Sequence, residues 1–466
     1  MEDNAPKLPY FDISHLCHMS SFEDDLASIE LKNFRHEFFG CGLSRAAVSN
    51  RIHIRVIVGV WCEQEMQTIV VRCGRLVDGT GRPPAENVAI LIEAGRIAKI
   101  GAESAVKVSS EARVVDASDE TVMPGLMDLH VHLDAVHIDP KKIDARGVLP
   151  EEPPDPAATA LYAYRNARNM LEAGFTTVRN FAGHYGYAVK KAIEHGLFVG
   201  PRIFHGEWVS PTAGHGPITG DEADGVDEVR KRTRQRLKAG ADWIKTPASG
   251  GAAGPGDWRR ANYTLEELKA IVEEAHGAKR RVATHAHSRG VTLAVEAGID
   301  DIEHGAEMED RTIQMMKEKG TFYVPTLAVY AWMAQESWLP EPILSKSREI
   351  TKEHIPSFKK ALEAGVKIGL GTDNGMFIPH NQSAVELECL VKNGMTEMQA
   401  IVAATKTAAE VLGLEASLGT IQEGKIADLI VVNDNPLSNI SMLRKPENIL
   451  LVMKEEQIIV ERLAGS

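Results

Sequence analysis

The chain has 466 residues, of which 44% are hydrophobic and 25% are charged. This composition supports a large packed core and is unlike that of a disordered chain. The formal net charge of −13 disfavours nucleic acid and anionic membranes as partners, because both are negatively charged. The five cysteines form no C-x-x-C pair, and no apolar run reaches the roughly 18 residues of a membrane helix. The sequence therefore predicts a cytoplasmic protein with reduced thiols and a small-molecule substrate, and it leaves a homo-oligomer open.

Residues 1–66 differ from the rest of the chain. They hold three of the five cysteines and show no sustained periodicity, whereas a strand-like segment with a Gly-rich turn follows Met66. We interpret 1–66 as an N-terminal extension that is either part of the native protein or the product of a start assigned upstream of Met66.

Two segments that flank the middle of the chain have β-strand character. Residues 67–126 contain short alternating runs separated by Gly, Asp and Pro, and residues 414–466 return to the same pattern. We expect the two flanks to combine into one small β-sandwich domain, with the middle of the chain inserted between them.

The middle segment, residues 127–413, repeats an apolar strand, an amphipathic helix and a glycine. The glycine after each helix suits a helix C-cap, because glycine adopts the left-handed conformation at little cost. Eight such strands are found, ending with VKIGLGTDN. Eight strands alternating with helices predict an α/β fold, a (β/α)8 TIM barrel. A doubly wound open sheet is the alternative, but no glycine fingerprint follows the first strand.

Polar residues that suit a metal site fall near the carboxyl ends of five of these strands, where TIM barrels place their active sites. His130 and His132 lie two residues apart on the first strand, so both imidazoles can reach one metal ion. A lysine in an apolar strand is unusual, because burying an unpaired ammonium is costly. The other candidates on later strands are Lys245, His285, His304 and Asp373.

The assembled motifs resemble the amidohydrolase superfamily, on the segment PGLMDLHVHLD at 124–134 together with the four later residues. Other stretches, including SPTAGHG at 210–216 and HAHSRG at 285–290, resemble its prolidase-like branch, which includes phenylurea and thiocarbamate hydrolases. The resemblance implies a binuclear centre of two divalent ions. His130, His132 and Asp373 would hold one ion and His285 and His304 the other, with Lys245 carboxylated by CO2 as the bridge. Zinc fits this ligand set, with cobalt and manganese as alternatives.

Such a centre implies hydrolysis of an amide, urea or carbamate-type carbon–nitrogen bond by a metal-bridging hydroxide, with Asp373 accepting and returning the proton. An Xaa-Pro dipeptidase is the alternative. A deaminase and a non-catalytic scaffold fit the sequence less well, because the chain has Lys245 and all six ligand positions.

Four residues are candidates for substrate contacts. Arg179 ends the second strand and could bind a carboxylate or serve as an ion-pair partner. His215 lies in a Gly-rich loop, His287 follows His285 by two positions, and Tyr263 begins a helix where it could donate to an oxyanion or simply pack. We also consider Glu303 as an acceptor that orients His304.

Overall fold

The computed structural model describes residues 68–106, 110–135, 155–181, 183–216, 220–254 and 256–463. These residues lie within the second of two compact units, Glu63–Ser466. The expected extension at 1–66 lies outside the described residues. The domain boundaries inferred from the sequence stay predictions. None of the helices described is long and apolar enough to cross a membrane.

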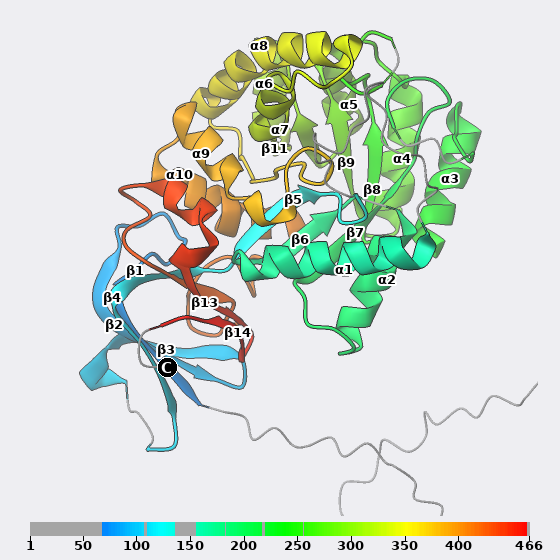
Figure 1. The fold of residues 1–466 in the computed structure, drawn as a ribbon. Helices are drawn as coiled ribbons and strands as arrows, with labels where there is room; N and C mark the ends of the chain where they lie inside the picture. The colour runs from blue at the N-terminus through cyan, green and yellow to red at the C-terminus, as the bar shows by residue number, and fades with distance from the viewer. Residues whose placement is uncertain are drawn as a thin grey trace, which may run out of the picture. The chain divides into compact units, whose positions relative to one another are not determined.

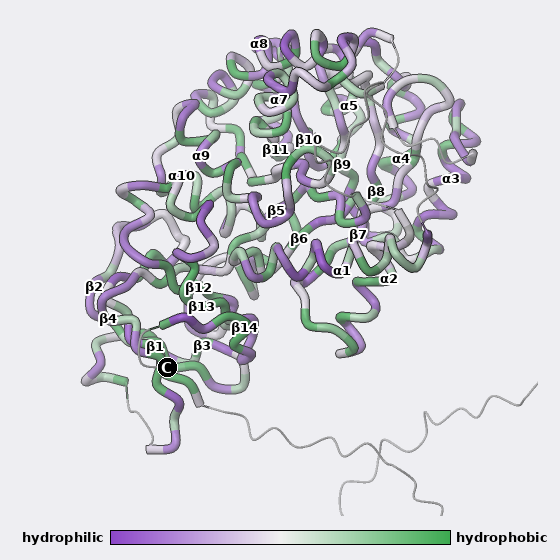
Figure 2. The backbone as a smooth tube through the Cα atoms, viewed as in Figure 1, coloured by the Kyte–Doolittle hydropathy of each residue, from purple (hydrophilic) through white to green (hydrophobic). Residues whose placement is uncertain are grey.

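One sheet joins strands from both flanks of the chain, in the order β14-β13-β12-β4-β1-β2-β3. β1 and β4 pair in parallel, and β12 pairs antiparallel with β4, so the C-terminal flank is hydrogen-bonded directly to the N-terminal one. Figure 2 shows hydrophobic residues along β12 and β13. The strands of this sheet are β1 (Ile69–Leu76), β2 (Ala85–Glu93), β3 (Arg96–Ala102), β4 (Arg113–Pro124), β12 (Leu429–Val432), β13 (Ile449–Lys454) and β14 (Gln457–Glu461).

A second, parallel sheet forms the TIM barrel, and its order β11-β10-β9-β8-β7-β6-β5 follows the chain. The strands are β5 (Leu126–Val131), β6 (Phe175–Asn180), β7 (Arg202–Trp208), β8 (Trp243–Pro247), β9 (Arg281–Ala286), β10 (Asp301–His304) and β11 (Phe322–Val324).

The eighth expected strand closes the ring with less regular pairing. It makes isolated parallel bridges, Tyr323 with Ile368 on one side and Val131 with Asn374 on the other. Backbone hydrogen bonds support both sides: Gly369 N–H donates to Tyr323 O at 2.9 Å, and Asp373 N–H donates to His130 O at 2.8 Å. The predicted barrel is confirmed, with an eighth strand that lacks a continuous ladder.

Helices cover the outside of the barrel strands (Figure 1). They are α1 (Pro156–Glu172), α2 (His184–Glu194), α3 (Val226–Lys238), α4 (Leu265–Gly277), α5 (Ser288–Ala297), α6 (Asp310–Lys319), α7 (Leu327–Met333), α8 (Glu341–Ala364), α9 (Val385–Lys392), α10 (Glu397–Val402) and α11 (Ala408–Leu412). The glycines expected to end five helices have positive φ, at Gly174, Gly240, Gly298, Gly320 and Gly365. Apolar side chains of the helices, such as Leu268 and Val295, belong to one buried cluster with those of the strands, which holds the helices against the barrel.

Candidate active site

A cavity of about 610 Å³ opens where the barrel strands end, and all six expected metal ligands line it. His130 and His132 come from β5 and the residue after it, Lys245 from β8, His285 from β9, His304 from the end of β10, and Asp373 from the eighth strand segment. The barrel therefore brings together residues that are as far apart in the sequence as His130 and Asp373.

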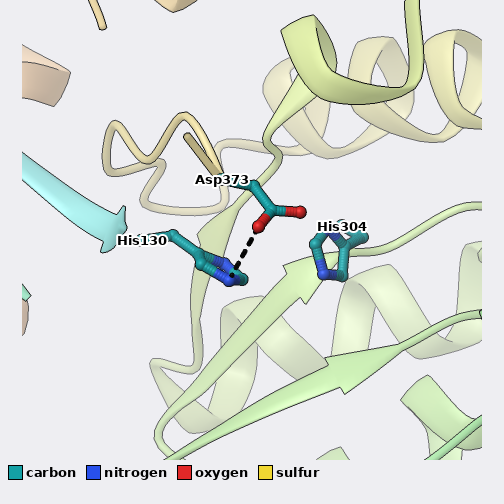
Figure 3. Close-up of side chains that lie close together, drawn as sticks. All are labelled: His130, His304 and Asp373. Carbon is teal, nitrogen blue, oxygen red and sulfur yellow. Dashed lines mark ion pairs between the residues drawn. The ribbon is translucent and has the colours of Figure 1, made fainter. Parts of the chain in front are cut away.

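The closest part of this cluster is formed by His130, His132 and Asp373. Oδ1 of Asp373 lies 3.3 Å from Nε2 of His130 and 2.9 Å from Nε2 of His132, and the two Nε2 atoms are 3.3 Å apart. One ligand atom each from His130, His304 and Asp373 lies within 4.8 Å of the others. Figure 3 shows the His130 ring and the Asp373 carboxylate turned toward one another, with His304 beside them.

Each of three histidines has one ring nitrogen held by a neighbouring oxygen. Nδ1 of His132 lies 3.0 Å from the Phe181 carbonyl oxygen, and Nδ1 of His304 lies 2.6 Å from Oγ1 of Thr326. In His285 it is Nε2 that is held, 2.9 Å from the carbonyl oxygen of Gly250. A ring with one nitrogen donating to such an acceptor offers the lone pair of the other, which is how metal-binding histidines are oriented.

Burial keeps the imidazoles of His130, His285 and His304 neutral. It lowers the pKa of His130, His285 and His304 well below the usual value of 6.5, and neighbouring basic side chains lower the pKa of each further. Neutral imidazole is the form that binds a metal ion. Burial also lowers the pKa of Lys245 well below 10.5, with Arg179 as the next cause, which favours the uncharged amine.

The backbone is left-handed at two of the candidate ligands. The φ angle is 72° at His304 and 56° at Asp373. Residues other than glycine seldom adopt this conformation, and where they do they concentrate at functional sites.

Below the cluster lies a buried ion network. Arg179 is fully buried and donates to both carboxylate oxygens of Asp301, at 2.7 and 3.0 Å, and to Oε1 of Glu303 at 3.1 Å. Glu303 also contacts Nζ of Lys245, and its Oε1 lies 3.2 Å from Nδ1 of His130. The structure thus differs from the sequence expectation for Glu303: its carboxylate faces His130, whereas the acceptor beside His304 is Thr326.

Of the four residues considered for substrate contacts, only His215 lines the cavity. Its ring stacks on that of His285, with 4.0 Å between the centroids. Burial lowers the pKa of His215 to about 4, so the ring is neutral at physiological pH. Gly251 makes this packing possible, because a Cβ there would lie 2.8 Å from Nδ1 of His215 and 2.9 Å from Nε2 of His285.

The structure places Arg179, Tyr263 and His287 away from the cavity wall. Arg179 uses its donors inside the barrel, and the hydroxyl of Tyr263 lies 3.3 Å from the Ala223 carbonyl oxygen, between segments packed around the barrel. His287 is fully buried, with Nε2 3.1 Å from the hydroxyl oxygen of Tyr330. The contacts of Arg179 and Tyr263 in the structure are with other parts of the protein, and a substrate contact by either residue stays a prediction.

Several lining residues were missed by sequence reasoning. They include apolar side chains of α7 and of the segment after Asp373, and polar side chains of β7, of α3 and of two loops. Tyr330 lies six residues after the carboxyl end of the seventh barrel strand. Its closeness to a strand end is the sequence signal that could have identified it as a site residue. The apolar lining residues are Val329, Tyr330, Met333, Met376 and Phe377, and the polar ones are Asp134, Glu207, Asp221 and Arg236.

Comparisons with known proteins agree with this geometry. The model of the amidohydrolase family matches residues 121–459. An ochratoxinase of Aspergillus niger is 33% identical over 448 residues, which is 88% of this chain and 90% of that protein.

Solved structures share the fold. A Xaa-Pro dipeptidase with methionine bound in its active site superposes with a TM-score of 0.77 and 33% identity, covering 84% of this chain and 99% of the dipeptidase. A molinate hydrolase, with a TM-score of 0.70 and 24% identity over 84% of this chain and 94% of its own, shows the fold alone. Amidohydrolases generally use divalent metal ions. The resemblance found in the sequence is confirmed: the chain belongs to the amidohydrolase family and is a hydrolase of carbon–nitrogen bonds.

Proposed function

We propose that this protein hydrolyses an amide, urea or carbamate bond at a centre of two divalent metal ions. The observation that supports this proposal is the meeting of four histidines, a lysine and an aspartate at one end of a single cavity. In the proposed assignment His130, His132 and Asp373 would hold one ion, His285 and His304 would hold the other, and a carboxylated Lys245 would supply oxygen ligands to both.

The donor set fits such ions. In His132, His285 and His304 one ring nitrogen lies beside an oxygen of the protein, which leaves the other for a metal. Mixed nitrogen and oxygen ligands suit zinc, with cobalt and manganese as alternatives. When bound, the ions would make a water nucleophilic at neutral pH and polarise the carbonyl of the substrate.

Lys245 has the surroundings that carboxylation requires. The reaction joins the neutral amine nitrogen to the carbon of CO2 and releases one proton, so it needs an unprotonated lysine. Full burial and the neighbouring guanidinium of Arg179 both favour that form. The product is an anion with two oxygens, which is a suitable ligand for divalent ions.

Asp373 is the candidate for moving the proton. Its Oδ1 lies beside Nε2 of His130 and of His132, and its side chain lines the cavity. A carboxylate in this position can accept a proton from the attacking water and donate it to the leaving nitrogen. His215, neutral and in the cavity wall, is the candidate for a hydrogen bond to the substrate.

The mixture of apolar and polar lining residues fits a substrate with an apolar part and a polar part. The apolar lining residues can contact a bulky hydrophobic group, and burying such a group contributes about 1.5–3 kcal/mol. An Xaa-Pro dipeptide is the second candidate. It is favoured by the likeness to a Xaa-Pro dipeptidase, and the cavity lining includes charged side chains, among them the ion pair of Arg236 with Asp221.

A turnover screen tests both candidates. Protein loaded with zinc, cobalt or manganese is incubated with Xaa-Pro dipeptides, N-acyl amino acids, and aryl ureas and carbamates, with Asp373→Asn as the inactive control. Turnover of the non-peptide amides alone supports the first candidate, and strong dipeptide turnover supports the second. If neither the wild type nor any metal form turns over a member of the three sets, the proposed function is wrong.

A further inference from the structure

Tyr330 holds a phenol group at the cavity wall beside the candidate metal ligands. It lies in α7, is 4% exposed, and its ring centroid is 5.4 Å from that of His304. Its hydroxyl oxygen has one hydrogen-bond partner among the described residues, Nε2 of His287 at 3.1 Å. If His287 is the donor in this pair, the hydroxyl hydrogen of Tyr330 is available to donate to a substrate.

The other nitrogen of His287 fixes the direction of this hydrogen bond. The backbone N–H of Ala306 donates to Nδ1 of His287 at 3.2 Å. A backbone amide can only donate, so Nδ1 must carry a lone pair, and the ring must then be neutral with its hydrogen on Nε2. Nε2 therefore donates to the hydroxyl oxygen of Tyr330, which acts as the acceptor in this pair.

The hydrogen of the phenol is consequently left for another acceptor. The structure shows no second partner for the Tyr330 hydroxyl within the described part of the chain. A buried donor without an acceptor is costly, by about 1–3 kcal/mol, and Tyr330 lines the cavity that would hold the substrate. An oxygen of a bound substrate is the natural partner.

His287 is itself held firmly in place. Its backbone N–H donates to Oγ of Ser249 at 2.9 Å, and its ring packs at right angles to that of Trp258, with 5.4 Å between centroids. Such support keeps Nε2 pointed at Tyr330 and leaves the phenol little freedom to reverse the hydrogen bond.

We propose that Tyr330 donates its phenolic hydrogen bond to the carbonyl oxygen of the scissile bond as negative charge develops there, and that His287 is the positioning residue that directs this donor. The hydrogen stays on Tyr330 throughout, so no covalent step is added to the reaction. The carbonyl oxygen is the chosen acceptor because Tyr330 packs against His304, where the reacting bond must lie. This inference rests on the proposed function.

The first test compares Tyr330→Phe with the wild type and with Tyr164→Phe, a matched loss of a hydroxyl on α1, where the ring stacks on Phe198 outside the cavity. The substrate is the one that the wild type turns over fastest, and its phosphonate analogue serves as a tetrahedral mimic. A lost donor to a developing oxyanion reduces kcat by roughly 10²–10³-fold. We expect this loss in Tyr330→Phe, with KM changed less than threefold and the analogue bound at least tenfold more weakly, and no change in Tyr164→Phe.

Other outcomes would overturn the proposal. If Tyr330→Phe keeps kcat within threefold of the wild type, the phenol is not a donor to the reacting carbonyl. If KM rises while kcat is unchanged, the phenol binds another oxygen of the substrate, such as a carboxylate. The proposed function itself is tested by the wild type: if the wild type shows no turnover, the proposed function is wrong.

The role of His287 is tested by a double-mutant cycle. His287→Leu removes the donor to Tyr330, whereas His287→Gln keeps an N–H donor at a similar distance along the side chain. We expect His287→Leu to lower kcat in the wild-type background and to have little further effect in Tyr330→Phe, with His287→Gln retaining more activity. Equal losses in both backgrounds would show that His287 does not act through Tyr330. Thermal unfolding identifies any variant that fails to fold, and His287→Gln then decides the question.

Discussion

Replacing Arg179 by Met separates two roles that this residue could play, in stability or in substrate binding. The guanidinium donates to the Leu129 carbonyl oxygen at 2.7 Å as well as to Asp301 and Glu303, and the three charged side chains are 0% exposed. It also packs between aromatic rings, 4.3 Å from the ring centroid of Trp243. Without the guanidinium, the carboxylates of Asp301 and Glu303 would stay buried and lose this positive partner. Breaking a buried ion pair in this way lowers the free energy of unfolding by about 3–5 kcal/mol.

The expected change in melting temperature follows from the size of the unit. An unfolding entropy of about 2.1 cal/mol/K per residue, over the roughly 400 residues of the second unit, gives about 0.85 kcal/mol per degree. Arg179→Met should therefore lower Tm by about 4–6 °C in calorimetry at a fixed scan rate. Arg82→Met is the matched control. Arg82 forms an exposed i,i+4 ion pair with Asp78, and its loss should change Tm by less than about 1 °C.

The opposite pattern would refute this reasoning. If Arg179→Met melts within 1 °C of the wild type and raises KM only for substrates that carry a carboxylate, then Arg179 contacts the substrate, as one reading of the sequence allowed. A lower Tm with the same loss of activity for charged and uncharged substrates supports the buried network.

Three further outcomes are expected. Asp373→Asn should lower kcat by roughly 10²–10⁴-fold, the usual contribution of a general acid–base group, and activity within a few fold of the wild type would remove Asp373 from this role. Gly251→Ala should reduce bound metal, measured by elemental analysis, because the added Cβ would press on His215 and His285. Gly277→Ala is its control, since no heavy atom lies within 4 Å of a Cβ there, and equal metal content in both variants would contradict the packing argument. Dialysis against a chelator should abolish turnover and lower Tm, with recovery on adding zinc, cobalt or manganese, because a ligand that binds only the folded state stabilises it; unchanged turnover and Tm would argue against a metal centre.

The barrel could be predicted from the sequence because its signals are local. Each strand, helix and closing glycine is encoded within about 30 residues, and the positive φ values at Gly174, Gly240 and Gly298 show that the glycines end helices for the expected reason. The irregular closure by the eighth strand was not predicted. Its pairing depends on two strands far away in the chain, and its backbone leaves the extended conformation at Asp373.

The candidate ligands could be predicted because side chains at the carboxyl ends of barrel strands converge on one site. The hydrogen-bond acceptors that orient the histidines could not be predicted. The acceptor beside His132 is the backbone oxygen of Phe181, and that beside His285 is the backbone oxygen of Gly250. A backbone oxygen is present at every residue, so side-chain identity carries no signal for either contact. The partner of Arg179, Asp301, lies 122 residues further along the chain, which is why an ion pair and a substrate contact were equally consistent with the sequence.

His304 shows where periodicity alone would have failed. Asp301 and Glu303 both bond to Arg179 inside the barrel, and successive side chains of a strand point to opposite faces, so a regular strand would turn His304 away from the cavity. The φ of 72° at His304 interrupts that alternation and lets its ring line the cavity. The following residue must be small, because a Cβ at Gly305 would lie 2.6 Å from the ring of Tyr323, whose hydroxyl donates to the His304 carbonyl oxygen at 2.7 Å. The Glu-His-Gly sequence at 303–305 thus places two adjacent polar side chains within one buried cluster, an arrangement that only a break in the strand permits.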